Sequence, residues 1–275
     1  MNQVFSFNRW LLFVAKHWSE NRKKYLLALV AMAGLLLLWH SFVILVERSH
    51  PLGVFEQGAT YFVGLFLIGC YYGSTLFSDL SGGPKAIHFL SIPASALEKL
   101  LTALLFGVVL FFMCYTIIFY AVDIPMMKVA NSVAADIWKE NGQAFTPSEV
   151  ANVFSLFDGG GIDPFHLMLL IFFPVQSAFT LGSIYFSKYS FIKTAISLLV
   201  VFFLTLLLVA NVFHEILPRG TYMDNMLSYR AQVGEEFRAV QLPAWITWII
   251  LTLFKYAFAP IIWVTTWFRL KEKEI

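Results

Sequence analysis

The chain has 275 residues, of which 59% are hydrophobic and only 13% are charged, and its mean hydropathy is +0.73. Ordinary soluble domains carry about a quarter charged residues, so this composition excludes them and indicates an integral membrane protein. The formal net charge of +2 is too small to indicate nucleic-acid binding. Cys70 and Cys114 both lie in apolar runs, where small hydrophobic side chains are a simpler interpretation than a disulfide or a metal pair.

The first residues carry an amphipathic pattern that predicts a helix over residues 1–23. On a helical wheel, one arc is apolar and holds Phe7, Trp10, Leu11, Val14 and Trp18. The opposite arc is charged and holds Arg9, Lys16 and Glu20. Such a helix lies in the membrane interface. The basic cluster at Asn21–Lys24 follows directly, and a positive anchor at the inner surface is its simplest interpretation.

Six apolar runs are long enough to cross roughly 30 Å of hydrocarbon at about 1.5 Å per residue. They cover residues 25–46, 60–78, 100–122, 165–186, 192–213 and 245–267. The first run is too long for a signal-peptide core and no small-residue cleavage pattern follows it, so we expect it to remain in the mature chain. The sequence therefore predicts an all-α integral membrane protein, a single transmembrane domain with six transmembrane helices and an N-terminal interfacial helix.

The distribution of basic residues predicts the orientation. An even number of spans puts both termini on one side, and basic residues are enriched in cytoplasmic segments. If the termini are cytoplasmic, the inner segments hold twelve basic residues and the outer segments six: Arg9, Lys16, Arg22, Lys23, Lys24, Lys85, Lys99, Lys188, Lys193, Arg269, Lys271 and Lys273 against Arg48, Lys128, Lys139, Arg219, Arg230 and Arg238. We therefore expect both termini in the cytoplasm.

The connection between the second and third spans, residues 79–99, carries the stretch HFLSIPASALEKLL. Ser95 and Glu98 have the spacing of a capping box, in which the hydroxyl accepts from the N3 amide and the carboxylate accepts from the N-cap amide. This pattern predicts a helix that begins after Ser95. The segment either serves only to start that helix or is also a surface that a partner binds.

Two long outer loops are predicted, at residues 123–164 and 214–243. In the first, TPSE at Thr146–Glu149 has the residues of a helix start and predicts a short helix before a glycine run. Pro164 after an aspartate should begin the fourth span. The second loop is polar, with an amphipathic pattern around Met223–Phe237.

Small residues gather on one face of the second span. Gly64, Gly69 and Gly73 allow a neighbouring helix to approach closely. That neighbour is another helix of the same bundle or, in the alternative, another subunit.

Four polar residues lie inside the predicted spans, where such groups are uncommon. Lys255 is near the centre of the last span and either faces a water-filled or substrate-bearing interface, or snorkels, binds a backbone carbonyl or is neutral. His40, Gln176 and Asn211 are better explained by hydrogen bonds between helices than by ligand binding. With Lys255 they are the candidate residues of a translocation route.

The sequence lacks the motifs of an enzyme. HEIL at His214 begins like a zinc-protease helix, but that motif needs a second histidine where this chain has Pro218. SGGPK at Ser81–Lys85 lacks the spacing of a phosphate-binding loop. We expect no catalytic, cofactor-binding or metal-binding residues and no cofactor in this chain.

The layout resembles the membrane (permease) subunit of bacterial ATP-binding-cassette transporters of the type-2 exporter class. Its most specific element is a phrase of the form FLxxPxSxxEK, matched by Phe89, Leu90, Pro93, Ser95, Glu98 and Lys99. The closing FRLKEKEI at Phe268–Ile275 is similar to the short charged tails of such permeases. Both long outer loops depart from the simplest members of this class.

The resemblance implies a function and a set of partners. Residues 79–99 would be the coupling segment, seated on a separate ATPase subunit that binds ATP and magnesium, through Lys85, His88, Phe89, Pro93, Ser95, Glu98 and Lys99. The chain would pair with a second permease, identical or related, in the bacterial cytoplasmic (inner) membrane as a multi-pass protein. It would export a substrate and perform no reaction itself.

Two other classes remain open. A non-transporting sensor or resistance scaffold would bind a ligand through the outer loops and would need no ATPase. A membrane enzyme would need a convergent polar cluster at the outer face, for which His166, His214 and Glu215 are the candidates.

Overall fold

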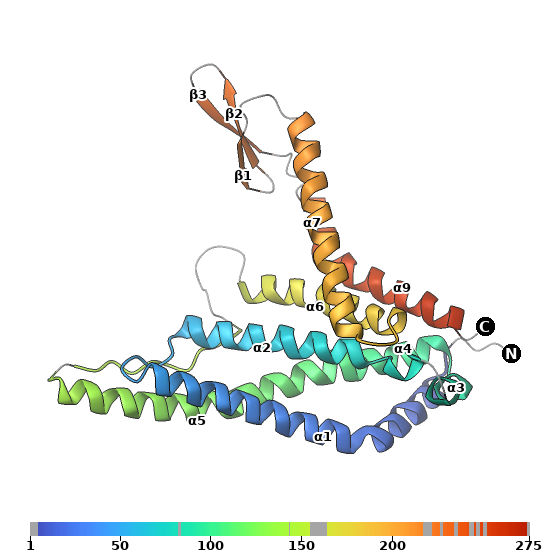
Figure 1. The fold of residues 1–275 in the computed structure, drawn as a ribbon, viewed down its shortest axis with the longest axis horizontal. Coiled ribbons are helices and arrows are strands. Elements are labelled where there is room, and N and C mark those ends of the chain that lie inside the picture. Colours follow the sequence, from blue (N-terminus) through green and yellow to red (C-terminus); the bar gives the residue numbers. More distant parts are fainter. Residues whose placement is uncertain are drawn as a thin grey trace.

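The computed structural model describes residues 5–81, 84–142, 144–154, 164–216, 222–225, 228–233, 236–241, 245, 248–249 and 252–273. Over these residues the chain is predominantly helical, with one small sheet (Figure 1). Five helical stretches in this part of the chain are long and apolar enough to cross a membrane: Phe7–Val46, Val54–Leu80, Ala96–Glu140, Met168–Tyr185 and Ser190–Val209. They indicate a multi-pass membrane protein. The sixth span, residues 245–267, is only partly described and stays a prediction.

Helix α1, Phe7–Val46, is one continuous helix of 40 residues. The predicted interfacial segment and first span are therefore parts of one helix, because the basic cluster at Asn21–Lys24 contains good helix formers and no glycine or proline. At about 1.5 Å per residue, α1 is roughly 60 Å long, about twice the hydrocarbon thickness. Its N-terminal part curves toward α3, Pro84–Ser91, at one end of the molecule (Figure 1).

Helix α2, Val54–Thr75, lies beside a long composite helix. The composite helix consists of α4, Ala96–Leu104, the π-helical η2, Leu105–Leu110, and α5, Phe111–Glu140. The helix continues beyond the predicted span end at residue 122, through Pro125 to Glu140, so the first part of the predicted outer loop is helical.

The extension of α5 is held by packing. Met127, Ala130 and Ala134 are buried at spacings of three and four residues, so one helical face is apolar. That part of α5 runs beside the C-terminal part of α1 (Figure 1). The stabilisation from burying this face offsets the loss of the backbone hydrogen bond that Pro125 cannot donate.

Helix α6, Pro164–Tyr185, begins at the predicted proline and packs on α2. A Cβ added at Gly69 would lie 2.7 Å from the ring of Phe172, and one at Gly73 would lie 3.2 Å from the backbone oxygen of Gln176. Gly69 and Gly73 therefore contact α6, and Gly64 faces Tyr115 of α5, so the glycine face packs within the same chain, as the bundle interpretation predicted. The core continues through large buried side chains of α2, α5 and α6: Tyr61, Leu65, Tyr115, Phe119 and Phe172.

The C-terminal part consists of α7, Ser190–Ile216, η3, Leu253–Ala257, and α9, Phe258–Lys273. α9 lies along α6, whereas α7 rises away from the other helices (Figure 1). The short η1, Ser78–Ser81, leads toward α3. The first turn of α1 and the last turn of α9 both lie at the α3 end of the molecule (Figure 1).

A small antiparallel sheet lies near the far end of α7 (Figure 1). Its strands are β1, Tyr222–Asn225, β2, Ser228–Val233, and β3, Glu236–Gln241, in the order β1-β2-β3. In β2 and β3, Tyr229 faces Val240 and Ala231 faces Arg238. The prediction of an all-α chain is therefore correct for the membrane-type helices and misses this sheet.

Candidate functional site

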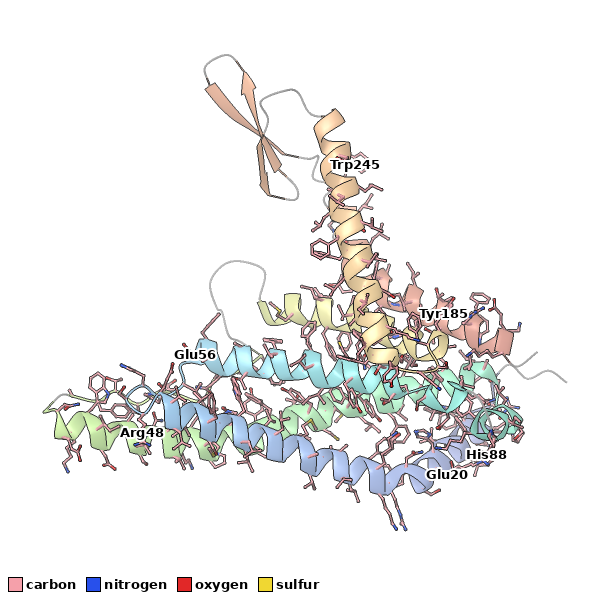
Figure 2. The ribbon with its side chains drawn as sticks, in the orientation of Figure 1. Glu20, Arg48, Glu56, His88, Tyr185 and Trp245 are labelled. Atoms are coloured by element: carbon pink, nitrogen blue, oxygen red, sulfur yellow. The ribbon has the colours of Figure 1, made fainter. Side chains whose placement is uncertain are left out.

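Helix α3 forms a surface at one end of the bundle. Its residues Lys85, Ile87 and His88 are exposed, with Ile87 72% exposed. Its residues Phe89 and Leu90 pack inward on an apolar cluster that includes Phe77, Leu80, Ala96, Leu100 and Leu270. His88 lies at the opposite end of the molecule from Arg48 (Figure 2). We call the exposed residues Lys85, Ile87, His88 and Pro93 the α3 surface.

Lys99 of α4 supports α3 from inside. Its side chain is buried, and its Nζ lies 3.5 Å from the backbone oxygen of Leu90 and 5.3 Å from the ring centroid of Phe89. The ring of Phe89 in turn meets Phe77 edge-on at 6.5 Å. The charge of Lys99 is thus directed at α3 and not at solvent.

The predicted capping box at Ser95 and Glu98 is confirmed. Ser95 Oγ accepts a hydrogen bond from the backbone N–H of Glu98 at 3.2 Å, and Glu98 Oε2 accepts from the backbone N–H of Ser95 at 2.9 Å. Two backbone donors at the start of α4 are therefore satisfied.

Glu98 also binds the N-terminal end of α1. Arg9 donates from Nε to Oε2 and from Nη2 to Oε1, both at 2.7 Å, and the backbone N–H of Ser6 donates to Oε1 at 2.8 Å. The Glu98 side chain is fully buried, while Arg9 is 36% exposed. This bidentate pair joins the first turn of α1 to the first turn of α4. Sequence reasoning missed Arg9, although a buried carboxylate requires a cationic partner.

The structure therefore separates the predicted coupling residues into two groups. Lys85, His88 and Pro93 are exposed, and Phe89 and Ser95 are half-buried. Glu98 and Lys99 are buried and make internal contacts. These two residues lie beneath the α3 surface and are not part of it.

Helix α4 leads directly into the π-helical segment η2, which contacts α1, α2 and α6. The ring of Phe106 stacks on Tyr25 of α1 with centroids 5.4 Å apart and lies 4.9 Å from the ring of His17. Gln176 of α6 donates from Nε2 to the backbone oxygen of Gly107 at 2.5 Å. π-Helical turns often occur at functional positions of helices. No sequence pattern predicted this one.

The three candidate route residues whose side chains are described do not converge. His40 bonds with Asp123 of α5, whereas Gln176 bonds with Gly107, several turns away on the same composite helix. Asn211 is exposed on α7. The side chain of Lys255 lies outside the described part of the structure.

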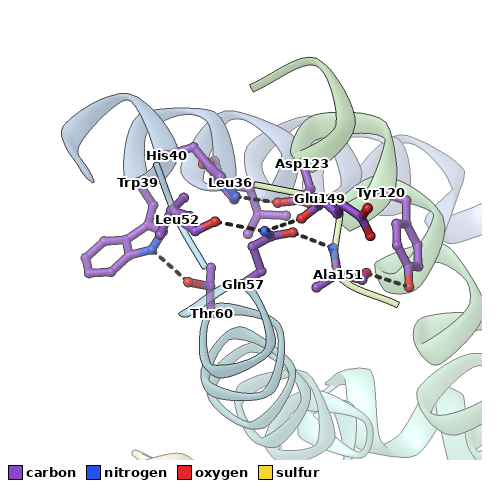
Figure 3. Close-up of polar contacts among 10 residues, drawn as sticks. All are labelled: Leu36, Trp39, His40, Leu52, Gln57, Thr60, Tyr120, Asp123, Glu149 and Ala151. Atoms are coloured by element: carbon purple, nitrogen blue, oxygen red, sulfur yellow. Dashed lines mark hydrogen bonds and ion pairs between the residues drawn. The ribbon is translucent and has the colours of Figure 1, made fainter. Parts of the chain in front are cut away.

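A polar network lies at the opposite end of the bundle (Figure 3). Gln57 of α2 donates to the backbone oxygen of Glu149 and accepts from the N–H of Ala151, at 3.0 Å and 2.7 Å. Asn131 of α5 accepts from the N–H of Ser148 at 3.1 Å and donates to the backbone oxygen of Ser148 at 2.9 Å. The two carboxamides thus hold residues 144–152 in an extended form. The predicted helix after Thr146 is wrong, because these side chains occupy the backbone groups that a helix would use.

The charged tail is anchored to α6. Lys273 donates from Nζ to the backbone oxygen of Ile184 at 2.8 Å, at the C-terminal end of that helix. Burial and the nearby charge of Arg269 lower the pKa of Lys273. The guanidinium of Arg269 lies 4.7 Å from the ring centroid of Tyr185. The C-terminal helix therefore ends against the same part of the molecule as α3 and the start of α1.

Comparison with family models, curated proteins and solved structures finds no match to this chain. Within the described residues, no group of three histidine, cysteine or acidic side chains has the arrangement of a metal site. The side chains of His166, His214 and Glu215 lie outside those residues. The geometry of the α3 surface and its supports is therefore the basis for assigning a function.

Proposed function

We propose that the chain is the permease subunit of a bacterial ATP-binding-cassette transporter of the type-2 exporter class, located in the cytoplasmic membrane. In this proposal the α3 surface docks on a separate ATPase subunit. A second permease, identical or related, completes the translocation route. The chain itself performs no reaction, and ATP and magnesium bind the partner.

One observation carries the proposal. A short helix with an exposed cationic and apolar face, α3, lies between two long apolar helices in the chain and rests on Lys99 of α4, whose first turn is itself fixed to α1. Glu98 joins α4 to α1, and Lys99 joins α4 to α3. A loop that served only to turn the chain would need neither connection.

The supports give the α3 surface a mechanical connection to the helices. α3 contacts Lys99 of α4, α4 continues into η2, and η2 contacts α1 through Phe106 and α6 through Gly107. A displacement of α3 would be passed to α4 because its first turn is capped and has little freedom to fray. Closure of two ATPases around ATP would thereby change the packing around η2. The altered packing would change the exposure of the route between two permeases.

The exposed helix α7 supports a role for further contacts in the membrane. Its apolar side chains are exposed along much of its length, among them Ile196, Leu199, Phe203 and Leu207. In the proposed assembly these residues contact lipid and the second permease.

The test is a co-purification experiment with matched variants. The tagged chain is isolated in mild detergent from its native host, beside the variants Ile87→Glu and Val150→Glu. Both positions are exposed and apolar, but Ile87 is on α3 and Val150 is in the extended segment at the other end. An ATPase with a phosphate-binding loop should accompany the native chain and Val150→Glu, and should be reduced at least tenfold for Ile87→Glu, which is about 1.4 kcal/mol of binding.

A circular-dichroism melting curve for each variant shows whether it is folded. Recovery of no ATPase with the native chain, even after chemical crosslinking, would contradict the proposal. The outer-loop sensor or scaffold would then be the better account.

A further inference from the structure

His40 and Asp123 form a buried pair that joins α1 to α5. Both side chains are fully buried, and His40 Nε2 lies 3.1 Å from Asp123 Oδ1. The other ring nitrogen, Nδ1, lies 2.9 Å from the backbone oxygen of Leu36 (Figure 3). The pair is on the half of the bundle remote from the α3 surface.

The hydrogen-bond partners determine how many protons the pair holds. A carbonyl oxygen only accepts, so Nδ1 of His40 must carry a proton. The contact between Nε2 and Oδ1 then needs one more proton, carried either by the ring or by the carboxyl group. The ring is an imidazolium facing a carboxylate, or it is a neutral imidazole facing a carboxylic acid. Without that proton, a nitrogen lone pair would face a carboxylate oxygen at 3.1 Å.

The surroundings favour keeping this proton. Asp123 Oδ2 is buried and has no hydrogen-bond partner among the described residues. A buried carboxylate with an unsatisfied oxygen is costly, whereas both protonated forms of the pair are neutral overall. The ring of Phe119 lies 6.2 Å from that of His40, which adds an apolar neighbour.

The charged groups of the neighbouring segments point elsewhere. The acidic and basic residues on the adjoining parts of α1, α2, α5 and the two connections are exposed: Glu47, Arg48, His50, Glu56, Lys128 and Glu149. The titratable groups closer to the pair are the hydroxyls of Tyr61 on α2 and Tyr120 on α5. Tyr61 bonds Thr116, and Tyr120 accepts from the N–H of Val153 at 3.0 Å.

From this geometry we infer that His40 and Asp123 are a proton-dependent latch that holds α1 against α5. The bound ligand is one proton shared between Nε2 and Oδ1. When that proton leaves, the contact becomes repulsive and the two helices separate at this level. The inference does not depend on whether the chain is a transporter.

Asp123→Asn provides a matched control. An asparagine amide donates its own hydrogen to Nε2 of a neutral imidazole whose Nδ1 still donates to Leu36. The same contact therefore forms without the shared proton. The variant should keep the latch closed at every pH, whereas the native pair should open as the pH rises.

The experiment measures the distance between spin labels at Val46→Cys on α1 and Val129→Cys on α5, two exposed positions beyond the pair. Cys70 and Cys114 are replaced by alanine, and the full chain is studied in lipid nanodiscs from about pH 6 to about pH 10, a range that begins near the ordinary pKa of histidine. The distribution should shift to longer distances with rising pH in the native pair and should not shift in Asp123→Asn.

Two outcomes overturn the inference. The first is a spin-label distance distribution that does not change with pH in the chain with the native pair. The second is a shift of that distribution in Asp123→Asn as large as the shift in the chain with the native pair. If Asp123→Asn does not fold, nitrogen NMR of histidine-labelled native chain decides, with the His40 signal identified by its loss in His40→Gln. Nδ1 should stay protonated throughout while the shared proton is lost, and an unprotonated Nδ1 at the low end of the range would refute the latch.

Discussion

The two ends of the helical bundle use buried acidic residues in opposite ways. At the α3 end, Glu98 accepts four hydrogen bonds, two from Arg9 and one each from the backbone of Ser6 and Ser95. At the other end, Asp123 has one partner, His40, and one oxygen with none among the described residues. A buried carboxylate whose oxygens all accept hydrogen bonds holds the neighbouring segments in place. When one carboxylate oxygen has no donor, the contact that the other oxygen makes depends on a proton. The first arrangement suits a rigid connection and the second suits a contact that opens.

The largest change in the free energy of unfolding is expected when His40 is removed. His40→Leu leaves the Asp123 carboxyl group buried without its partner, and we expect a loss of about 3–5 kcal/mol in the free energy of unfolding. Chemical unfolding in detergent micelles measures this loss. A double variant, His40→Leu with Asp123→Leu, should recover most of the loss, and failure to recover it would show that the pair is not coupled.

The second effect concerns the rigid end. Glu98→Ala removes the capping box and the connection to α1, and we expect a loss of about 2–3 kcal/mol in the free energy of unfolding. Amide hydrogen exchange should rise in the first turns of α1 and of α4. Glu20→Ala is the matched control, since its exposed pair with Lys16 should contribute less than about 0.5 kcal/mol. Equal exchange in the two variants would contradict the role of Glu98.

The third effect concerns the extended segment at the latch end. Gln57→Leu removes both hydrogen bonds to the backbone of residues 149 and 151, and we expect a loss of about 1–2 kcal/mol. Cleavage of residues 144–152 by a protease should become faster, while the α3 end should be unaffected. If the cleavage rate is unchanged, Gln57 does not hold this segment.

The smallest change in stability is expected in the middle of the bundle, between the two ends. Gly69→Ala places a Cβ 2.7 Å from the ring of Phe172, and we expect a loss of about 1–2 kcal/mol from overpacking. Gly34→Ala on α1 meets nothing within 4 Å and should be neutral or stabilise by up to about 1 kcal/mol through helix propensity. Thermal unfolding of the two variants should differ in sign or size, and equal losses would mean that α2 and α6 are not in close contact.

Local features of the fold were predictable from the sequence. The capping box at Ser95 and Glu98 is a contact over three residues, and the start of α6 at Pro164 follows from the residue itself. The apolar runs located the helices because hydrophobic length is a property of each segment. The glycine face of α2 was also read correctly, since small residues at helical spacing predict close packing.

Contacts between distant residues were not predictable. Arg9 and Glu98 are 89 residues apart, and His40 and Asp123 are 83 residues apart. Neither pair has a local signature, so the rigid end and the latch emerge only when the helices are packed. The third span was predicted to end at residue 122, but the helix continues to Glu140 because its next turns are buried against α1. TPSE marked a false helix start, because Gln57 and Asn131 bind the backbone of that segment.

Crosslinking from the α3 surface tests whether α3 docks on an ATPase. A photoreactive amino acid is placed at position 87, and in a second chain at position 150, and the crosslinked proteins are identified by mass spectrometry in native cells. Position 87 should capture an ATPase with a phosphate-binding loop, and position 150 should not. Capture of no such ATPase at position 87, or equal capture at both positions, would contradict the assignment of α3 as the coupling surface.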